Sequence, residues 1–198
     1  VDIADGSFIL TGSNGSAAAG NITIQADTIS LTGGFPDEAL FTNISAFGSG
    51  SLEGSTISLS GRGSSGLTLT MSDPGQILTR STCGRGGDIQ IEMDNVTIAG
   101  GASLEAQSAD SASAGNILVT ARESFTLTGV SLGRASAISS NSRLSPANIS
   151  ITTGQFLLGE GAKIVGNTSA PQGGQIGISA TESITIQDNS PTIQDNSQ

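Results

Sequence analysis

The stretch GGDIQIEMDNVTIAGGASLEAQ, at residues 86–107, decides the fold. Its apolar residues come in pairs that lie two positions apart: Ile89/Ile91, Val96/Ile98 and Leu104/Ala106. Side chains alternate between the two faces of a strand, so each pair marks a short strand with two apolar side chains on one face. The glycines between the pairs would interrupt a helix and suit tight turns instead. The stretch therefore predicts one coil of three short strands.

The first two pairs of this stretch recur seven times along the chain. The first pairs are Val1/Ile3, Ile22/Ile24, Ile57/Leu59, Ile89/Ile91, Ile117/Val119, Ile149/Ile151 and Ile176/Ile178. The second pairs are Phe8/Leu10, Ile29/Leu31, Leu67/Leu69, Val96/Ile98, Phe125/Leu127, Phe156/Leu158 and Ile184/Ile186. Successive first pairs begin 21, 35, 32, 28, 32 and 27 residues apart, which is typical of stacked repeat units. We expect an all-β fold over a single domain at residues 1–198: a parallel β-helix, or solenoid, of about seven coils with three short strands per coil and almost no helix.

The third strand of each coil and the corners follow weaker patterns. Third strands are expected at Ile44/Ala46, Ile77, Ile138, Ile164 and Ile193. Extra residues after the second strand are expected to bulge from the coil as loops at Phe35–Thr42, Ser108–Ala114 and Arg134–Ser145. A small residue followed by Asn, Asp or Gln precedes most first strands, as in Gly20-Asn21, and is expected at a corner.

Composition excludes several classes of function. Seven basic and seventeen acidic residues give a net charge of −10, which opposes nonspecific binding to nucleic acid or anionic lipid. One cysteine and no histidine exclude a disulfide framework and a Cys/His metal cluster. No stretch approaches 18 apolar residues, so no membrane insertion is expected. No signal peptide is recognisable, and a secretion signal would lie outside this segment.

Carboxylates are the only common catalytic groups left, because the chain has no histidine. Glu92/Asp94 and Asp188/Asp195 are candidate pairs, although spacing alone cannot place them at a catalytic separation. Acidic residues also recur two positions before the second strands: Asp27, Asp94, Glu123 and Glu182. They could line a calcium site, which needs several oxygen ligands, but corner carboxylates that accept backbone N–H bonds are the preferred interpretation. We expect no enzyme and no catalytic, metal or cofactor site.

Polar residues form further patterns on the outward side of the strands and at the corners. Hydroxyl groups recur on the second strands: Ser30, Thr68, Thr97, Thr126 and Thr185. Stacked, they would form a column like that of ice-binding solenoids, although Thr is also favoured on any exposed strand face. Asn-x-Ser/Thr triplets begin at Asn14, Asn21, Asn43, Asn95, Asn148 and Asn167. We interpret these as corner asparagines, which could stack into hydrogen-bonded ladders, and Cys83 as a loop thiol that could crosslink subunits if exposed.

Three segments carry a resemblance to a known family: GNITIQAD at residues 20–27, SFTLTG at 124–129 and GGQIGISA at 173–180. They resemble repeats of filamentous-haemagglutinin-like exoproteins secreted by two-partner systems, and the large cyanobacterial versions are the most similar. The resemblance implies a right-handed parallel β-helix, export across an outer membrane and a role at the cell surface. No segment matches the N-terminal secretion domain of that family, so the chain looks like the repeat shaft.

Two classes of function remain open. The leading hypothesis is a structural or adhesive element of an extracellular, cell-surface protein or fibre, either as part of a longer repeat shaft or as a subunit that self-associates end to end. Uncapped ends and the near-duplicate segments at residues 185–190 and 192–197 favour it. The alternative is a carbohydrate-binding or polysaccharide-cleaving β-helix that uses the loops Phe35–Thr42 and Arg134–Ser145 as a groove wall. An ice-binding solenoid is less favoured.

Overall fold

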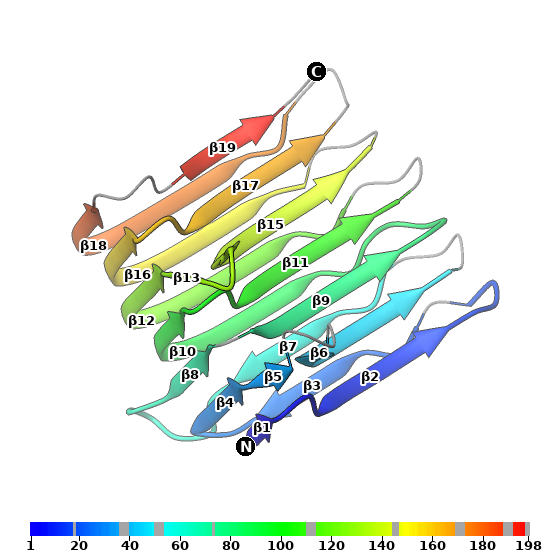
Figure 1. Ribbon diagram of the computed structural model, residues 1–198, viewed down its shortest axis with the longest axis horizontal. Coiled ribbons are helices and arrows are strands. Elements are labelled where there is room, and N and C mark those ends of the chain that lie inside the picture. Colours follow the sequence, from blue (N-terminus) through cyan, green and yellow to red (C-terminus); the bar gives the residue numbers. More distant parts are fainter. Residues whose placement is uncertain are drawn as a thin grey trace.

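The chain forms a parallel β-solenoid, as the repeats predict, but with about six coils instead of the expected seven (Figure 1). The computed structural model describes residues 1–17, 19–35, 40–49, 54–72, 74–109, 114–143, 147–168, 173–187 and 192–196. Every regular element in these ranges is a strand. In the same ranges, no helix is long and apolar enough to cross a membrane.

The first and second strands of the coils together build one nine-stranded sheet. In the early coils they are separate strands: β1 (Asp2–Ala4), β3 (Ile22–Gln25), β4 (Thr28–Thr32), β7 (Ile57–Ser60) and β8 (Thr68–Met71). In the later coils they run on as single bent strands: β10 (Ile89–Ile98), β12 (Ile117–Thr128), β16 (Ile149–Gly159) and β18 (Ile176–Ile186). The pairing register shifts at the bend, for example between Met93 and Asn95 of β10, because a bulge there turns the strand.

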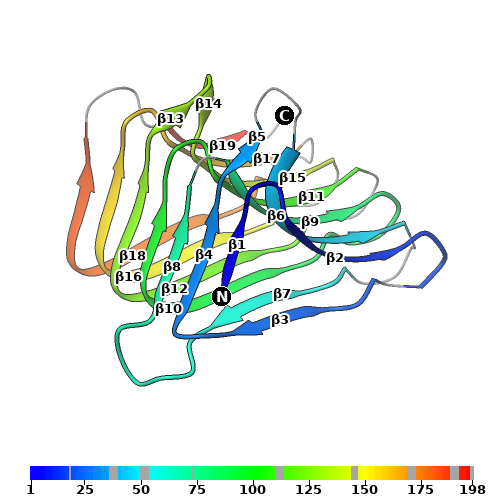
Figure 2. The ribbon, with the colours of Figure 1, turned by 60° about the horizontal axis from the view of Figure 1, so that its bottom comes forward.

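The third strands build a second sheet in which neighbouring coils again pair in parallel. Its strands are β2 (Phe8–Ser13), β6 (Leu40–Gly48), β9 (Gly75–Ser81), β11 (Ser103–Ser108), β15 (Ala137–Ser142), β17 (Lys163–Thr168) and β19 (Thr192–Asn196). Figure 2 shows how β4 and β8 rise from the ends of β3 and β7 toward this second sheet. Two antiparallel strand pairs lie where the chain passes from a second to a third strand. They are β5 (Gly34–Phe35) with β6, and β13 (Val130–Ser131) with β14 (Arg134–Ala135).

The interior is filled by columns of apolar side chains that repeat from coil to coil. One column runs through Ile57, Ile89, Ile117 and Ile149 at the start of the first strands, and all are buried. In the second strands the rings of Phe125 and Phe156 stack 5.5 Å apart at 6°. Each fully buried side chain of this size contributes about 1.5–3 kcal/mol. Neighbouring strands lie about 4.8 Å apart, so the columns are continuous.

The corner between second and third strands is a repeated tight turn. In three coils the central residues both have positive φ, at Asp5-Gly6, Gly100-Gly101 and Glu160-Gly161. The flanking backbone closes each turn with a hydrogen bond, as from Ala102 N–H to Ala99 C=O (3.1 Å). Positive φ at both central positions defines a type I′ turn, which favours glycine. The glycines after the second strands therefore occupy the corners that the sequence predicts for them.

The register of the first coil differs from the expectation. Val1/Ile3 is not a first-strand pair, because Ile3 lies beside Leu31 of the second strand β4. Phe8/Leu10 is not a second-strand pair either: Ile9 pairs with Ile44 of the third strand, and Phe8 and Leu10 point outward with 67% and 59% exposure. The chain thus enters the solenoid at a second strand. This explains the short first spacing of 21 residues and leaves six full coils after a partial one.

Two further predictions are wrong, one of a second-strand pair and one of a loop. Leu69/Met71, not Leu67/Leu69, aligns with Val96/Ile98, and Leu67 is buried at the preceding bend. The segment Arg134–Ser145 is no loop, since it contains β14 and β15; residues 144–146 lie outside the described ranges. In the other two expected loops, residues 36–39 and 110–113 lie outside the described ranges.

The expected third strands are confirmed. Ile44, Ile77, Ile138, Ile164 and Ile193 all lie on third strands, joined there by Leu104. All but Ile193, in the last coil, are fully buried.

Candidate functional site

The corner before the first strands carries a ladder of side-chain amides and one carboxylate. Each side-chain oxygen accepts a hydrogen bond from a backbone N–H of the next coil: Asn21 from Thr56 (2.8 Å), Asp88 from Asn116 (2.7 Å), Asn116 from Asn148 (3.1 Å) and Asn148 from Gln175 (3.0 Å). Because these hydrogen bonds run from one coil to the next, the corner links neighbouring coils. Of the asparagines predicted at corners, Asn21 and Asn148 are confirmed there. The prediction is wrong for Asn43 and Asn167, which lie within the third strands β6 and β17.

The four acidic residues before the second strands also bind protein donors. Asp27 Oδ1 accepts the backbone N–H groups of Arg62 (3.1 Å) and Gly63 (2.7 Å). Asp94 is buried, accepts the Leu67 N–H (3.0 Å) and pairs with Arg122 Nε (2.7 Å). These two confirm the corner-carboxylate interpretation. Glu123 and Glu182 instead accept side-chain amides, from Asn95 and Gln155 (2.8 Å each).

Of the two candidate carboxylate pairs, the described residues test only Glu92/Asp94, and these two side chains lie in different surroundings. Glu92 is exposed on its strand, whereas Asp94, beyond the bend, is buried against Arg122. Asp188 lies outside the described ranges, as does the side chain of Asp195. Within the described residues, no three Asp, Glu or Cys side chains gather as a metal site would require.

The hydroxyl column on the second strands exists, with one change of member. Thr70, not Thr68, lies in register with Ser30 and Thr97, because the inward pair of β8 is Leu69/Met71. The column continues through Thr126, is broken by Leu157 and resumes at Thr185.

The cysteine and the aromatic residues outside the core have definite places. Cys83 is exposed, as a loop thiol should be. The guanidinium of Arg134 lies 4.5 Å from the ring centroid of Phe41, so a cation already occupies one face of that ring. Phe47 is half-buried on the outward side of β6, and the side chain of Phe35 lies outside the described part.

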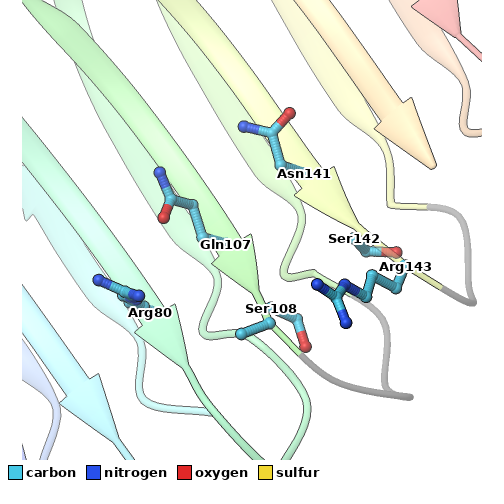
Figure 3. Close-up of a pocket in the computed structure, with 7 residues that line it drawn as sticks. Arg80, Gln107, Ser108, Asn141, Ser142 and Arg143 are labelled. Atoms are coloured by element: carbon cyan, nitrogen blue, oxygen red, sulfur yellow. The ribbon is translucent and has the colours of Figure 1, made fainter. Parts of the chain in front are cut away.

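A cationic hollow lies on the outward side of the third-strand sheet, where β9, β11 and β15 end (Figure 3). We call it the arginine pocket; it has a volume of about 180 Å³. Its lining residues are Arg80, Gln107, Ser108, Ala109, Asn141, Ser142 and Arg143. Arg80, Gln107 and Asn141 are in register on successive strands, and in Figure 3 the side chain of Arg143 reaches back toward Ser108.

Hydrogen bonds fix the amides of the arginine pocket. Asn141 Oδ1 accepts from Asn167 Nδ2 (2.8 Å) on the next strand, and Asn141 Nδ2 lies 3.3 Å from Ser139 Oγ. Gln107 Nε2 donates to Glu105 Oε2 (2.6 Å) on the same strand. These bonds orient both side chains before any ligand arrives, and each amide nitrogen keeps a second hydrogen to donate.

A second hollow, of about 240 Å³, lies on the outward side of the first strands. Ser60, Gln90, Glu92, Leu118 and Thr120 are among its lining residues. Its one charged side chain is the carboxylate of Glu92, so its electrostatic character is opposite to that of the arginine pocket.

Sequence reasoning missed the arginine pocket. Its residues come from three coils, and the third strands carry the weakest repeat. A signal was present, because Arg80, Gln107 and Asn141 each follow the buried isoleucine or leucine of their strand, Ile77, Leu104 or Ile138, by three positions.

The fold and these surfaces define the class of the protein as a β-solenoid. Comparison of the chain with models of known families, with curated proteins and with solved structures finds no match. The parallel β-solenoid implied by the resemblance to filamentous-haemagglutinin-like repeats is confirmed by the strand pairing, while its right-handedness and membership of that family stay proposals.

Proposed function

We propose that the chain is a structural or adhesive shaft element of a secreted bacterial cell-surface protein or extracellular fibre, in which further coils stack on its last coil. The observation that carries this proposal is the apolar surface of the last coil. Ile184, Ile186 and Ile193 are 53%, 55% and 42% exposed. Their register partners one coil earlier, Phe156, Leu158 and Ile164, are at most 1% exposed.

The last coil is thus built like an interior coil that lacks its cover. The same in-register columns that fill the interior reach the surface there, next to strands whose outer backbone groups face no further coil among the described residues. Burying the exposed halves of three isoleucines would contribute about 1 kcal/mol each. Unpaired strand edges add hydrogen-bonding groups that favour another strand in parallel. A further coil in register would bury the isoleucines and pair the strand edges.

In a solution of this chain alone, the covering coil comes from the N-terminal end of a second copy. That end offers strands of matching spacing, with Val1 half-exposed just before β1. The resemblance to filamentous-haemagglutinin-like repeats agrees with this role and supports an extracellular location.

Sedimentation velocity and electron microscopy of the purified 1–198 chain test the proposal. We expect a concentration-dependent series of rods that lengthen by one chain at a time. The double variant Ile184→Glu/Ile186→Glu places two charges on the uncovered coil and should give only single chains.

The matched control is Leu118→Glu/Val130→Glu, which adds the same charge at exposed apolar positions away from the last coil. It should assemble like the unmodified chain, and circular dichroism should show the same strand content for all three proteins. Single chains at every concentration of the unmodified protein would contradict end-to-end assembly.

A further inference from the structure

The basic residues of this acidic chain are distributed unevenly. Of its seven basic residues, Arg85 and Arg122 pair with aspartates and Arg134 stacks on Phe41. Arg80 and Arg143 both line the arginine pocket, and neither has an ion-pair partner among the described residues. Two unpaired guanidinium groups in one hollow, on a protein of net charge −10, form a local site for an anionic group.

An acidic residue on the central strand of the pocket is already engaged. Glu105, two positions before Gln107 on β11, accepts hydrogen bonds from Ser103 Oγ (2.8 Å), Gln76 Nε2 (3.1 Å) and Gln107 Nε2 (2.6 Å). Three donors stabilise its charge in place, and it forms no ion pair with either arginine of the pocket. Asp110, one position beyond Ala109, lies outside the described ranges.

The remaining lining groups suit a ligand with many hydroxyls. Gln107 and Asn141 hold fixed amides, and Ala109 is the one apolar side chain of the lining. Ser108 and Ser142 are buried at its floor, where Ser108 Oγ donates to Gly84 O (3.2 Å), so the amides are the groups left for a ligand. Amides both donate and accept, so they match sugar hydroxyl groups, whereas guanidinium groups only donate and match carboxylate oxygens in pairs.

The size and position of the arginine pocket suit a single monomer of a longer polymeric ligand. A volume of about 180 Å³ holds about six water molecules and is below the range of ~300–1,000 Å³ typical of small-molecule sites. The polar column continues past the pocket from Asn141 to Asn167 on the next strand. A linear polymer lying along the solenoid would meet a polar group on each coil, about 4.8 Å apart.

We propose that the arginine pocket binds a carboxylate-bearing sugar unit of an acidic polysaccharide, with Arg80 and Arg143 on the carboxylate and the amides of Gln107 and Asn141 on the neighbouring hydroxyls. This inference is independent of end-to-end assembly, because the pocket lies on a lateral face and its lining residues all belong to one chain. The shaft function alone gives the arginine pocket no ligand, and this inference supplies one.

The test is isothermal titration of the single-chain variant Ile184→Glu/Ile186→Glu with an oligogalacturonate at about 0.1 M salt, where surface charges interact over about 10 Å. Using this variant keeps binding separate from assembly. We expect saturable binding with one site per chain. Arg80→Gln and Arg143→Gln should each weaken it at least tenfold.

The matched control is Arg62→Gln, which removes the same charge from an exposed arginine outside the pocket and should leave the affinity within twofold. A neutral oligosaccharide of the same length should bind at least tenfold more weakly, and free acetate should not displace the ligand. Equal weakening by Arg62→Gln, equal binding of the neutral sugar, displacement by acetate, or tighter binding of a polyglutamate peptide would each overturn the proposal. So would the absence of binding.

Discussion

At the scale of single residues, Leu132 occupies the least suitable backbone position of the described chain. It has φ of +52° and is 68% exposed at the tip of the β13–β14 hairpin, followed by Gly133 at φ +77°. A two-residue hairpin loop with both φ values positive is a type I′ turn, for which Asn-Gly is the favoured sequence. A leucine there has the cost of the left-handed conformation, about 1–2 kcal/mol, without packing in return.

We predict that Leu132→Asn raises the free energy of unfolding by about 1 kcal/mol, because asparagine tolerates the left-handed region. Urea denaturation followed by circular dichroism measures it. Leu132→Ala is the control, since alanine removes the exposed side chain but keeps the unfavourable backbone. An equal gain in both variants would attribute the effect to the apolar side chain and not to the turn.

Asp94 makes two polar contacts at the bend between first and second strands, with Leu67 N–H and Arg122. Asp94→Ala removes the acceptor of the buried Leu67 N–H and the partner of Arg122, so we expect a loss of about 2–3 kcal/mol. Asp94→Asn keeps an oxygen for Leu67 and should lose less. Glu92→Ala, at an exposed position of the same strand, should change the stability by less than about 0.5 kcal/mol. Urea midpoints as low for Glu92→Ala as for Asp94→Ala would contradict this ranking.

At the scale of elements, the corner before the first strands requires glycine because coils approach each other through their backbones. A Cβ built on Gly115 would lie 1.9 Å from Gly87 O, and one on Gly87 would lie 1.8 Å from Ser55 O. Backbone atoms cannot move aside as a flexible side chain can. This close approach brings the corner amides within reach of the next coil, as in the hydrogen bond from Asn116 N–H to Asp88.

We predict that Gly115→Ala lowers the free energy of unfolding by about 2–3 kcal/mol, since the coils must separate locally to accept the methyl group. Gly177→Ala is the matched control, because nothing lies within 4 Å of its Cβ position. Thermal unfolding of the two variants should differ clearly. If Gly115→Ala unfolds with the unmodified chain, the close approach at this corner is wrong.

The elements also show where prediction from sequence succeeds and where it stops. Alternation identified the inward residues wherever polar residues separate apolar ones, as in Ile89-Gln90-Ile91. It failed at Phe8-Ile9-Leu10, where three consecutive apolar residues hide which face is inward. The Asp5-Gly6 step was the missing clue, because it matches Gly100-Gly101 after another second strand. The arginine pocket needed three third strands in register, which the variable loop lengths conceal.

At the scale of the whole molecule, two kinds of interaction act against each other at the ends of the solenoid. Two chains that approach end to end each carry a net charge of −10 and repel, while the uncovered isoleucines of the last coil attract. Repulsion between surface charges is screened by salt, with a Debye length that falls from about 30 Å at ~0.01 M to about 3 Å at ~1 M. Apolar burial does not weaken under the same change.

We therefore predict that assembly of the 1–198 chain strengthens as sodium chloride rises from ~0.01 M to ~1 M, with longer rods at a fixed protein concentration. Sedimentation velocity across the salt series measures the distribution of lengths. Ile184→Glu/Ile186→Glu should remain single at every salt concentration, because screening cannot restore the apolar contact. Assembly that weakens with salt would mean that ion pairs hold the ends together, and the uncovered apolar coil would then not be the surface that joins one chain to the next.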